Sequence, residues 1–225
     1  MPSWDQILVI LPYLSETTAV VGLTGTSALL VLLYDWRLSM LILLLQYILA
    51  NVLLIHFIPA EIALFKFIVG AMVCTVLFMS VRRAETETAA PRSTRWKGGV
   101  RVWAHHEVFS VGLPFRLLTI VLLGLVVHTL LQRSPLQGVS PHLNFAIYWL
   151  GLIGLLIMML SARPWKVGLG LLTFLTAFEL FYVTLERGLL VTALLGVLQM
   201  TIVLSLGYLI TMRAESLRIG GAFDE

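Results

Sequence analysis

The chain of 225 residues is 59% hydrophobic and only 12% charged, with a mean hydropathy of +0.97, whereas soluble domains are about 45–50% apolar. This composition excludes an ordinary soluble protein and predicts an integral membrane protein, with no room beside the apolar segments for a separate soluble catalytic domain. The formal net charge is +3, and we expect one membrane domain and no nucleic-acid partner.

Seven segments are long and apolar enough to cross a membrane as helices, since a span needs about 20 mostly apolar residues. Residues 1–16 contain Asp5 and Glu16 but no basic stretch, which argues against a cleaved signal peptide. We expect them to form an interfacial helix or an extension of the first span that is kinked at Pro12. The sequence therefore predicts an all-α membrane bundle with about seven transmembrane helices, at residues 17–34, 38–58, 62–81, 115–131, 145–160, 167–185 and 189–212.

Basic residues cluster strongly on one side of the predicted membrane. Lys66 lies inside a span, and only Arg133 and Arg187 fall on the less basic side. The positive-inside rule then places the N-terminus outside and the C-terminus in the cytoplasm of a bacterial or archaeal inner membrane. The other side carries Arg37, Arg82, Arg83, Arg92, Arg95, Lys97, Arg101, Arg116, Arg163, Lys166, Arg213 and Arg218.

The long basic segment at residues 82–114 is predicted to be a cytoplasmic loop, and residues 213–225 a cytoplasmic tail. The half of the loop that reads "VRVWAHHEVFSVGLPF" is expected to lie along the membrane surface and contact lipid headgroups or a partner. Its adjacent His105, His106 and Glu107 do not have the spacing of metal ligands. The single Cys74 is interpreted as a small buried apolar residue. We expect no metal and no cofactor.

Two halves of the chain show a weak internal similarity. Each half begins and ends with arginine, and between them lie an outward span, a short acidic turn and a returning span. The two segments are "RLSMLILLLQYILANVLLIHFIPAEIALFKFIVGAMVCTVLFMSVRR" and "RPWKVGLGLLTFLTAFELFYVTLERGLLVTALLGVLQMTIVLSLGYLITMR". Because both copies run in the same direction, the pattern favours a parallel repeat. Residues 17–81 and 145–212 would be its two three-helix units, joined by a connector helix at residues 115–131.

Glu179 and Lys66 are ionisable residues inside predicted spans. Both lie about 10 Å from the outer ends of their helices at 1.5 Å per residue, so opposite charges at one level could pair. A lone charge near the bilayer centre costs at least about 2.5–3.5 kcal/mol. Lys66 could instead extend its ammonium to the outer surface. Glu179 could be a neutral packing carboxyl or a group that changes protonation along an ion path.

Other polar residues accompany this pair. Thr173 and Thr176 share the helix face of Glu179. The amides of Asn51, Gln46 and Gln199 are interpreted as helix-packing groups or, for Asn51 and Gln199, as members of the path. His56 and His128 could ligate a haem between the second and fourth spans, but no small residues beside them make room for one, so we expect interfacial histidines.

Taken together, these segments resemble the small membrane subunits of the complex I superfamily. The closest likeness is to the E subunit of the hydrogenase-4 and formate hydrogenlyase type, with regions like the complex I K subunit and the Mrp antiporter C subunit. It is carried by "RLSMLILLLQYILANVLLIHF", by "ALFKFIVGAMV" with Lys66, and by "LLIMMLSARPWKVGLGLLTFLTAFELFYVTL" with Glu179. Where the family often has Asn after this glutamate the chain has Leu180, and Gln199 stands in place of a second membrane glutamate.

The resemblance implies a non-catalytic membrane-arm subunit of a proton- or cation-translocating complex, packed against antiporter-like and other membrane subunits and against lipid. Glu179 would be the relay group, Lys66 its electrostatic modulator, and Gln199 and Asn51 its polar neighbours. No independent enzyme activity is expected, although the complex could be an oxidoreductase. The alternatives are a small self-contained transporter and a structural subunit of another bioenergetic membrane complex.

Overall fold

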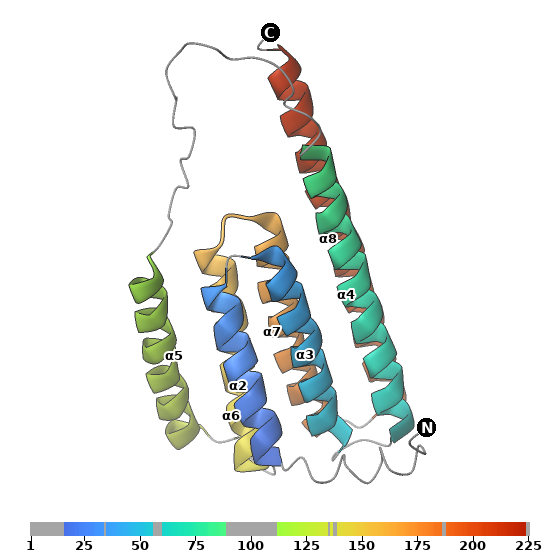
Figure 1. Cartoon of the computed structure of the whole chain (residues 1–225). Coiled ribbons are helices and arrows are strands. Elements are labelled where there is room, and N and C mark those ends of the chain that lie inside the picture. Colours follow the sequence, from blue (N-terminus) through green and yellow to red (C-terminus); the bar gives the residue numbers. More distant parts are fainter. Residues whose placement is uncertain are drawn as a thin grey trace, which may run out of the picture.

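The computed structural model describes residues 16–33, 35–55, 60–88, 112–134, 136, 139–185 and 188–223. Within these ranges the chain forms seven α-helices and no strand (Figure 1). The all-helical bundle predicted from composition is therefore confirmed. The helices are α2 (Glu16–Leu32), α3 (Trp36–Ile55), α4 (Ala60–Thr88), α5 (Leu113–Arg133), α6 (Pro141–Leu160), α7 (Pro164–Leu185) and α8 (Leu189–Phe223).

Six of the described helices, α3 to α8, are long and apolar enough to cross a membrane. The remaining helix, α2, is apolar but has 17 residues, about 25 Å at 1.5 Å per residue, slightly less than the roughly 30 Å hydrocarbon core. The proposed kink at Pro12 lies outside the described residues. Because α2 packs against both α3 and α6, it forms part of the bundle interior.

Helices α6 and α7 pack closely, because two glycines bring their backbones together. A Cβ atom on Gly154 would lie 2.7 Å from the backbone nitrogen of Phe174 and 2.8 Å from the carbonyl oxygen of Gly170. Small residues at helix crossings are typical of membrane bundles, in which close van der Waals packing replaces the hydrophobic effect. This contact fixes α7, the helix that carries Glu179, against the centre of the bundle.

Equivalent helices of the two predicted three-helix units meet across the bundle. Helix α2 contacts α6, α3 contacts α7, and α4 contacts α8, while α5 packs on the outside against α6 and α2 (Figure 1). Two units related by a twofold axis would pair their helices in this way. The parallel repeat itself stays a prediction from the sequence.

Several helix ends differ from the spans predicted by hydropathy. Helix α4 continues to Thr88 beside α8, and α8 extends farther, to Phe223 (Figure 1), so parts of the segments assigned to the loop and the tail are helical. Their polar continuations contain many Ala, Glu and Arg residues, which favour helix without being apolar.

Helix α6 starts earlier than residue 145 because Ser140 caps it. The Ser140 hydroxyl oxygen accepts a hydrogen bond from the Leu143 amide at 3.4 Å, and Pro141 suits the first helical turn.

One end of the bundle, which we call the basic end, carries six of the described cationic side chains. Two of them are buried and donate hydrogen bonds to carbonyls at the end of α2 and just beyond it. Arg116 Nη1 donates to Val31 O at 2.9 Å and Lys166 Nζ donates to Leu33 O at 2.7 Å, which complements the negative end of the helix dipole. The positive-inside rule predicts that this end faces the cytoplasm. The six are Arg37, Arg82, Arg83, Arg116, Arg163 and Lys166.

Candidate functional site

Helix α7 presents Glu179 to the interior of the bundle, with only 3% of the residue exposed. Thr176 and Thr173 lie on the same face because residues three apart in a helix are neighbours. Both threonine hydroxyls donate to carbonyls of their own helix, at 2.9 Å to Leu172 O and Leu169 O. Their protons are therefore used within α7, and the oxygens keep lone pairs that can accept hydrogen bonds.

Lys66 of α4 forms an ion pair with Glu179, its Nζ facing the carboxylate oxygen Oε1. The two side chains are 8% and 4% exposed. The pairing predicted from their similar depth is confirmed, and the alternative in which Lys66 extends its ammonium to the surface is wrong. Each charge now offsets the desolvation of the other, which a single charge at this position could not do.

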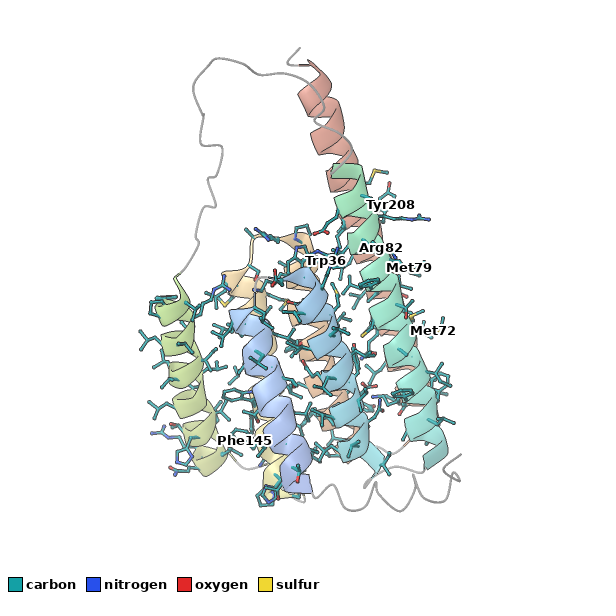
Figure 2. The ribbon with its side chains drawn as sticks, viewed as in Figure 1. Trp36, Met72, Met79, Arg82, Phe145 and Tyr208 are labelled. Atoms are coloured by element: carbon teal, nitrogen blue, oxygen red, sulfur yellow. The ribbon has the colours of Figure 1, made fainter. Side chains whose placement is uncertain are left out.

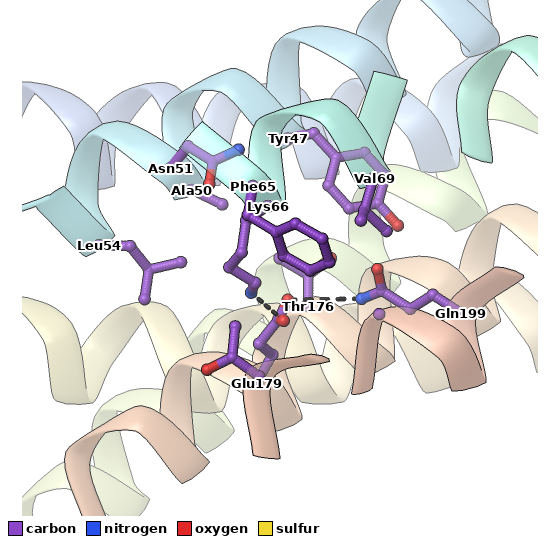
Figure 3. Close-up of a pocket in the computed structure, with 12 residues that line it drawn as sticks. Tyr47, Ala50, Asn51, Leu54, Phe65, Lys66, Val69, Thr176, Glu179 and Gln199 are labelled. Atoms are coloured by element: carbon purple, nitrogen blue, oxygen red, sulfur yellow. Dashed lines mark hydrogen bonds and ion pairs between the residues drawn. The ribbon is translucent and has the colours of Figure 1, made fainter. Parts of the chain in front are cut away.

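Gln199 of α8 completes the contacts of the carboxylate. Its Nε2 donates to Oε2 of Glu179 at 3.4 Å, a long hydrogen bond (Figure 3). One carboxylate oxygen thus faces an ammonium and the other an amide. We call Lys66, Glu179 and Gln199 the polar triad. Three helices, α4, α7 and α8, supply one member each, and α4 is distant from the other two in the sequence.

A small cavity adjoins the polar triad and is walled by α3, α4, α7 and α8 (Figure 3). About 10 Å³ is free for the centre of a water molecule, room for roughly one water. Among the described side chains, the buried Oδ1 atom of Asn51 in this wall has no hydrogen-bond donor, and a water in the cavity would supply one. The residues that line it are Tyr47, Ala50, Asn51, Leu54, Phe65, Lys66, Val69, Thr176, Glu179, Thr192, Gly196 and Gln199.

The polar triad lies closer to the end of the bundle opposite the basic end. Lys66 follows the start of α4 at Ala60 by six residues, and Glu179 precedes the end of α7 at Leu185 by six. At 1.5 Å per residue, both are about 9 Å from those helix ends. Thr192, in the first turn of α8, also lines the cavity. The shorter route from the cavity to water therefore leads toward this opposite end.

The structure brings together all four residues that the sequence proposed for a path, Glu179, Lys66, Gln199 and Asn51, around one cavity. Two further residues that line the cavity, Tyr47 and Thr192, were not predicted from the sequence. The only signal for Tyr47 is its spacing of four residues from Asn51, which places both on one face of α3. Thr192 had no signal apart from being polar at the start of an apolar helix.

Other polar candidates lie away from this cavity. Gln46 of α3 is 1% exposed, and neither of its amide atoms has a hydrogen-bond partner among the described residues. His128 is exposed on α5 and its Nε2 is 3.1 Å from the Nε2 of Gln132. His56, its suggested haem partner, lies outside the described residues, as do His105, His106 and Glu107.

No protein-family model, curated protein or solved structure matches the chain. Within the described ranges, no three His, Cys, Asp or Glu side chains lie together as metal ligands would. The resemblance to complex I subunits stays an expectation from the sequence.

Proposed function

We propose that the chain is a non-catalytic membrane subunit of a proton- or cation-translocating assembly, and that the polar triad with Asn51 forms part of its ion path. The observation that carries this proposal is a buried Lys66–Glu179 ion pair beside a cavity for one water. Ionisable residues within membrane spans are rare, and they commonly mark ion or proton pathways.

Stability alone does not account for the ion pair. Replacing a buried ion pair by apolar residues of similar volume is often neutral or stabilising by about 1–4 kcal/mol. A packing role would therefore be filled as well by apolar side chains at positions 66 and 179. A proton-accepting carboxylate, in contrast, has chemistry that no apolar side chain supplies.

The triad also has the parts that ion transfer requires. Protonation of Glu179 would remove the charge that holds Lys66, and the freed ammonium would turn toward another acceptor. Asn51, which lines the cavity, offers its Oδ1 as one such acceptor. The ammonium of Lys66 would thus have two arrangements, and the protonation of Glu179 would determine which one it adopts. Such a pair of arrangements is the basis of a gated path. For a metal cation, the carboxylate would instead be the ligand and Lys66 its competitor.

The size of the interior cavity argues against a carrier of organic solutes. Sites for such molecules usually measure about 300–1,000 Å³, whereas the cavity at the triad leaves about 10 Å³ for a water centre. Three larger hollows among the described residues, of about 260–370 Å³, are open grooves on the helix surfaces. The site therefore suits a proton or a small dehydrated cation.

Purification in a mild detergent, followed by mass spectrometry of the intact assembly, tests this proposal. We expect stoichiometric recovery of larger membrane subunits, including antiporter-like and redox partners. Reconstituted alone in liposomes, the chain should conduct neither protons nor sodium. Recovery without partners, together with ion flux through the isolated chain, would refute the proposal and favour a self-contained transporter. A Soret band would point to a haem-bearing subunit.

A further inference from the structure

We propose that a groove between α4 and α8 at the basic end binds an anionic phospholipid, independently of the polar triad. The groove has a volume of about 370 Å³, within the range of ligand sites. It lies level with the start of α3, where Phe78 of α4 packs against Trp36, just before α4 and α8 extend past the rest of the bundle (Figure 1). Its polar lining residues are Ser80 and Arg83 of α4 with Tyr208 and Thr211 of α8, and Gly207 of α8 lies between them.

A glycine sets the floor of this groove. A Cβ atom on Gly207 would lie 2.6 Å from Ser80 Oγ, so the backbones of α4 and α8 approach closely at this level only because position 207 has no side chain. The larger neighbours Arg83 and Tyr208 then stand on the two rims, each of them exposed. The result is a trough with a floor of small residues and walls that end in polar groups.

The rim offers the donors that a lipid phosphate needs. Arg83 presents a guanidinium, which binds phosphate oxygens with two parallel N–H groups. Tyr208 is 61% exposed, and tyrosines at membrane surfaces commonly contact lipid headgroups. The hydroxyl protons of Ser80 and Thr211 are donated to Val76 O and Gly207 O at 2.8 and 3.1 Å. Their oxygens are left as acceptors, which suit a headgroup with hydroxyls such as glycerol.

An apolar trough continues from the groove toward the middle of the membrane. Val76 belongs both to the groove and to a second hollow of about 320 Å³ on the outer face of α4, lined also by Ile68 and Met72. From Arg83 to Ile68 the helix rises about 22 Å, which exceeds half of the roughly 30 Å hydrocarbon core. Figure 2 shows Met72, Met79 and Arg82 in succession along α4, with Tyr208 of α8 near the upper end.

The combination of charge and shape selects the class of ligand. A cationic rim above an apolar trough of acyl-chain length matches one phospholipid with a negative headgroup, as basic pockets between transmembrane helices commonly do. A zwitterionic lipid would fill the trough but gain less at Arg83. We therefore expect the site to prefer phosphatidylglycerol over phosphatidylcholine.

Neighbouring arginines provide a matched test. Arg82 and Arg83 are both exposed, but only Arg83 lines the groove. The chain is placed in detergent with defined amounts of phosphatidylglycerol or phosphatidylcholine, and bound lipid is counted by native mass spectrometry. Arg83→Gln should lower the preference for phosphatidylglycerol roughly fivefold, the effect of one interfacial cation, whereas Arg82→Gln should change it by less than about twofold. Equal losses in both variants, or no preference in the unaltered chain, would overturn the proposal.

A photocrosslinking amino acid in place of Tyr208 distinguishes a lipid from a protein occupant in native membranes. An adduct with the mass of a phospholipid supports the proposal. An adduct to another polypeptide as the main product would show that this face is a subunit interface, and would refute a lipid site. Either result is independent of whether Glu179 conducts ions.

Discussion

The ion pair between Lys66 and Glu179 leads to a quantitative prediction about stability. Glu179→Leu removes the carboxylate and leaves the ammonium of Lys66, on a side chain that is 8% exposed, without its counter-charge. Breaking a buried pair from one side typically costs about 3–5 kcal/mol. Lys66→Met should lower the unfolding free energy by a similar amount, because the carboxylate of Glu179 is left without its partner. Protonation of that carboxylate would limit the loss. We expect each single variant to lose about 3 kcal/mol of unfolding free energy.

The double variant Lys66→Met with Glu179→Leu should recover most of this loss. It leaves no stranded charge, and the new side chains have volumes close to the old ones, so its stability should return to within about 1 kcal/mol of the unaltered chain. Gln199→Leu is the matched control for coupling to Glu179. Its 3.4 Å hydrogen bond should contribute less than about 1 kcal/mol, as such bonds do within membranes.

Reversible unfolding in mixed dodecyl sulfate and maltoside micelles, followed by the fluorescence of the tryptophans and by circular dichroism, measures the four free energies of the cycle. A double variant that loses as much as the two single variants together would refute the reasoning. In that case the two residues act independently, and the ion pair is not formed in the folded protein.

Two further predictions concern packing and the attachment of α5. Gly154→Ala should lower the unfolding free energy in the same assay by about 1–3 kcal/mol, because the added Cβ would meet backbone atoms at 2.7–2.8 Å. The control is Gly25→Ala, whose Cβ would have nothing within 4 Å and which should raise the unfolding free energy by about 0.5–1 kcal/mol through helix propensity. Equal effects of the two substitutions would contradict the packing. Arg116→Met removes the 2.9 Å hydrogen bond to Val31 O and should lower the unfolding free energy by about 1.5–3 kcal/mol. The backbone amides of α5 should then exchange hydrogen faster, whereas Arg133→Met, at an exposed position, should leave that exchange unchanged.

Hydropathy was sufficient to predict the helices, because apolar runs of about 20 residues have few alternatives to crossing a membrane. It did not predict how far α4 and α8 extend, since their continuations are polar and only helix propensity marks them. It also did not distinguish the cations at the basic end. Arg116 of α5 and Lys166 of α7 are buried against the end of α2, while Arg82 and Arg83 of α4 remain exposed. This difference depends on which helices contact each other.

The site was predictable to the extent that membrane burial is costly. A carboxylate and an ammonium at the same depth have a strong reason to pair, so the sequence led to Lys66 with Glu179. The remainder of the cavity required the tertiary structure. Tyr47 and Thr192 are ordinary residues in their own helices, and they become part of the site only because α3 and α8 pack beside α4 and α7.

The most direct test of the proposed path is ion translocation by the intact assembly carrying Glu179→Gln. This change keeps the shape of the side chain and removes its charge. The control is Glu85→Gln, an exposed carboxylate on the extension of α4. Vesicles of the native membrane are energised with the electron donor of the copurified assembly, and the ion gradient is recorded together with the redox rate. We predict that Glu179→Gln abolishes most of the gradient while Glu85→Gln has no effect. An undiminished gradient in Glu179→Gln vesicles, at an unchanged level of assembled complex, would contradict the account.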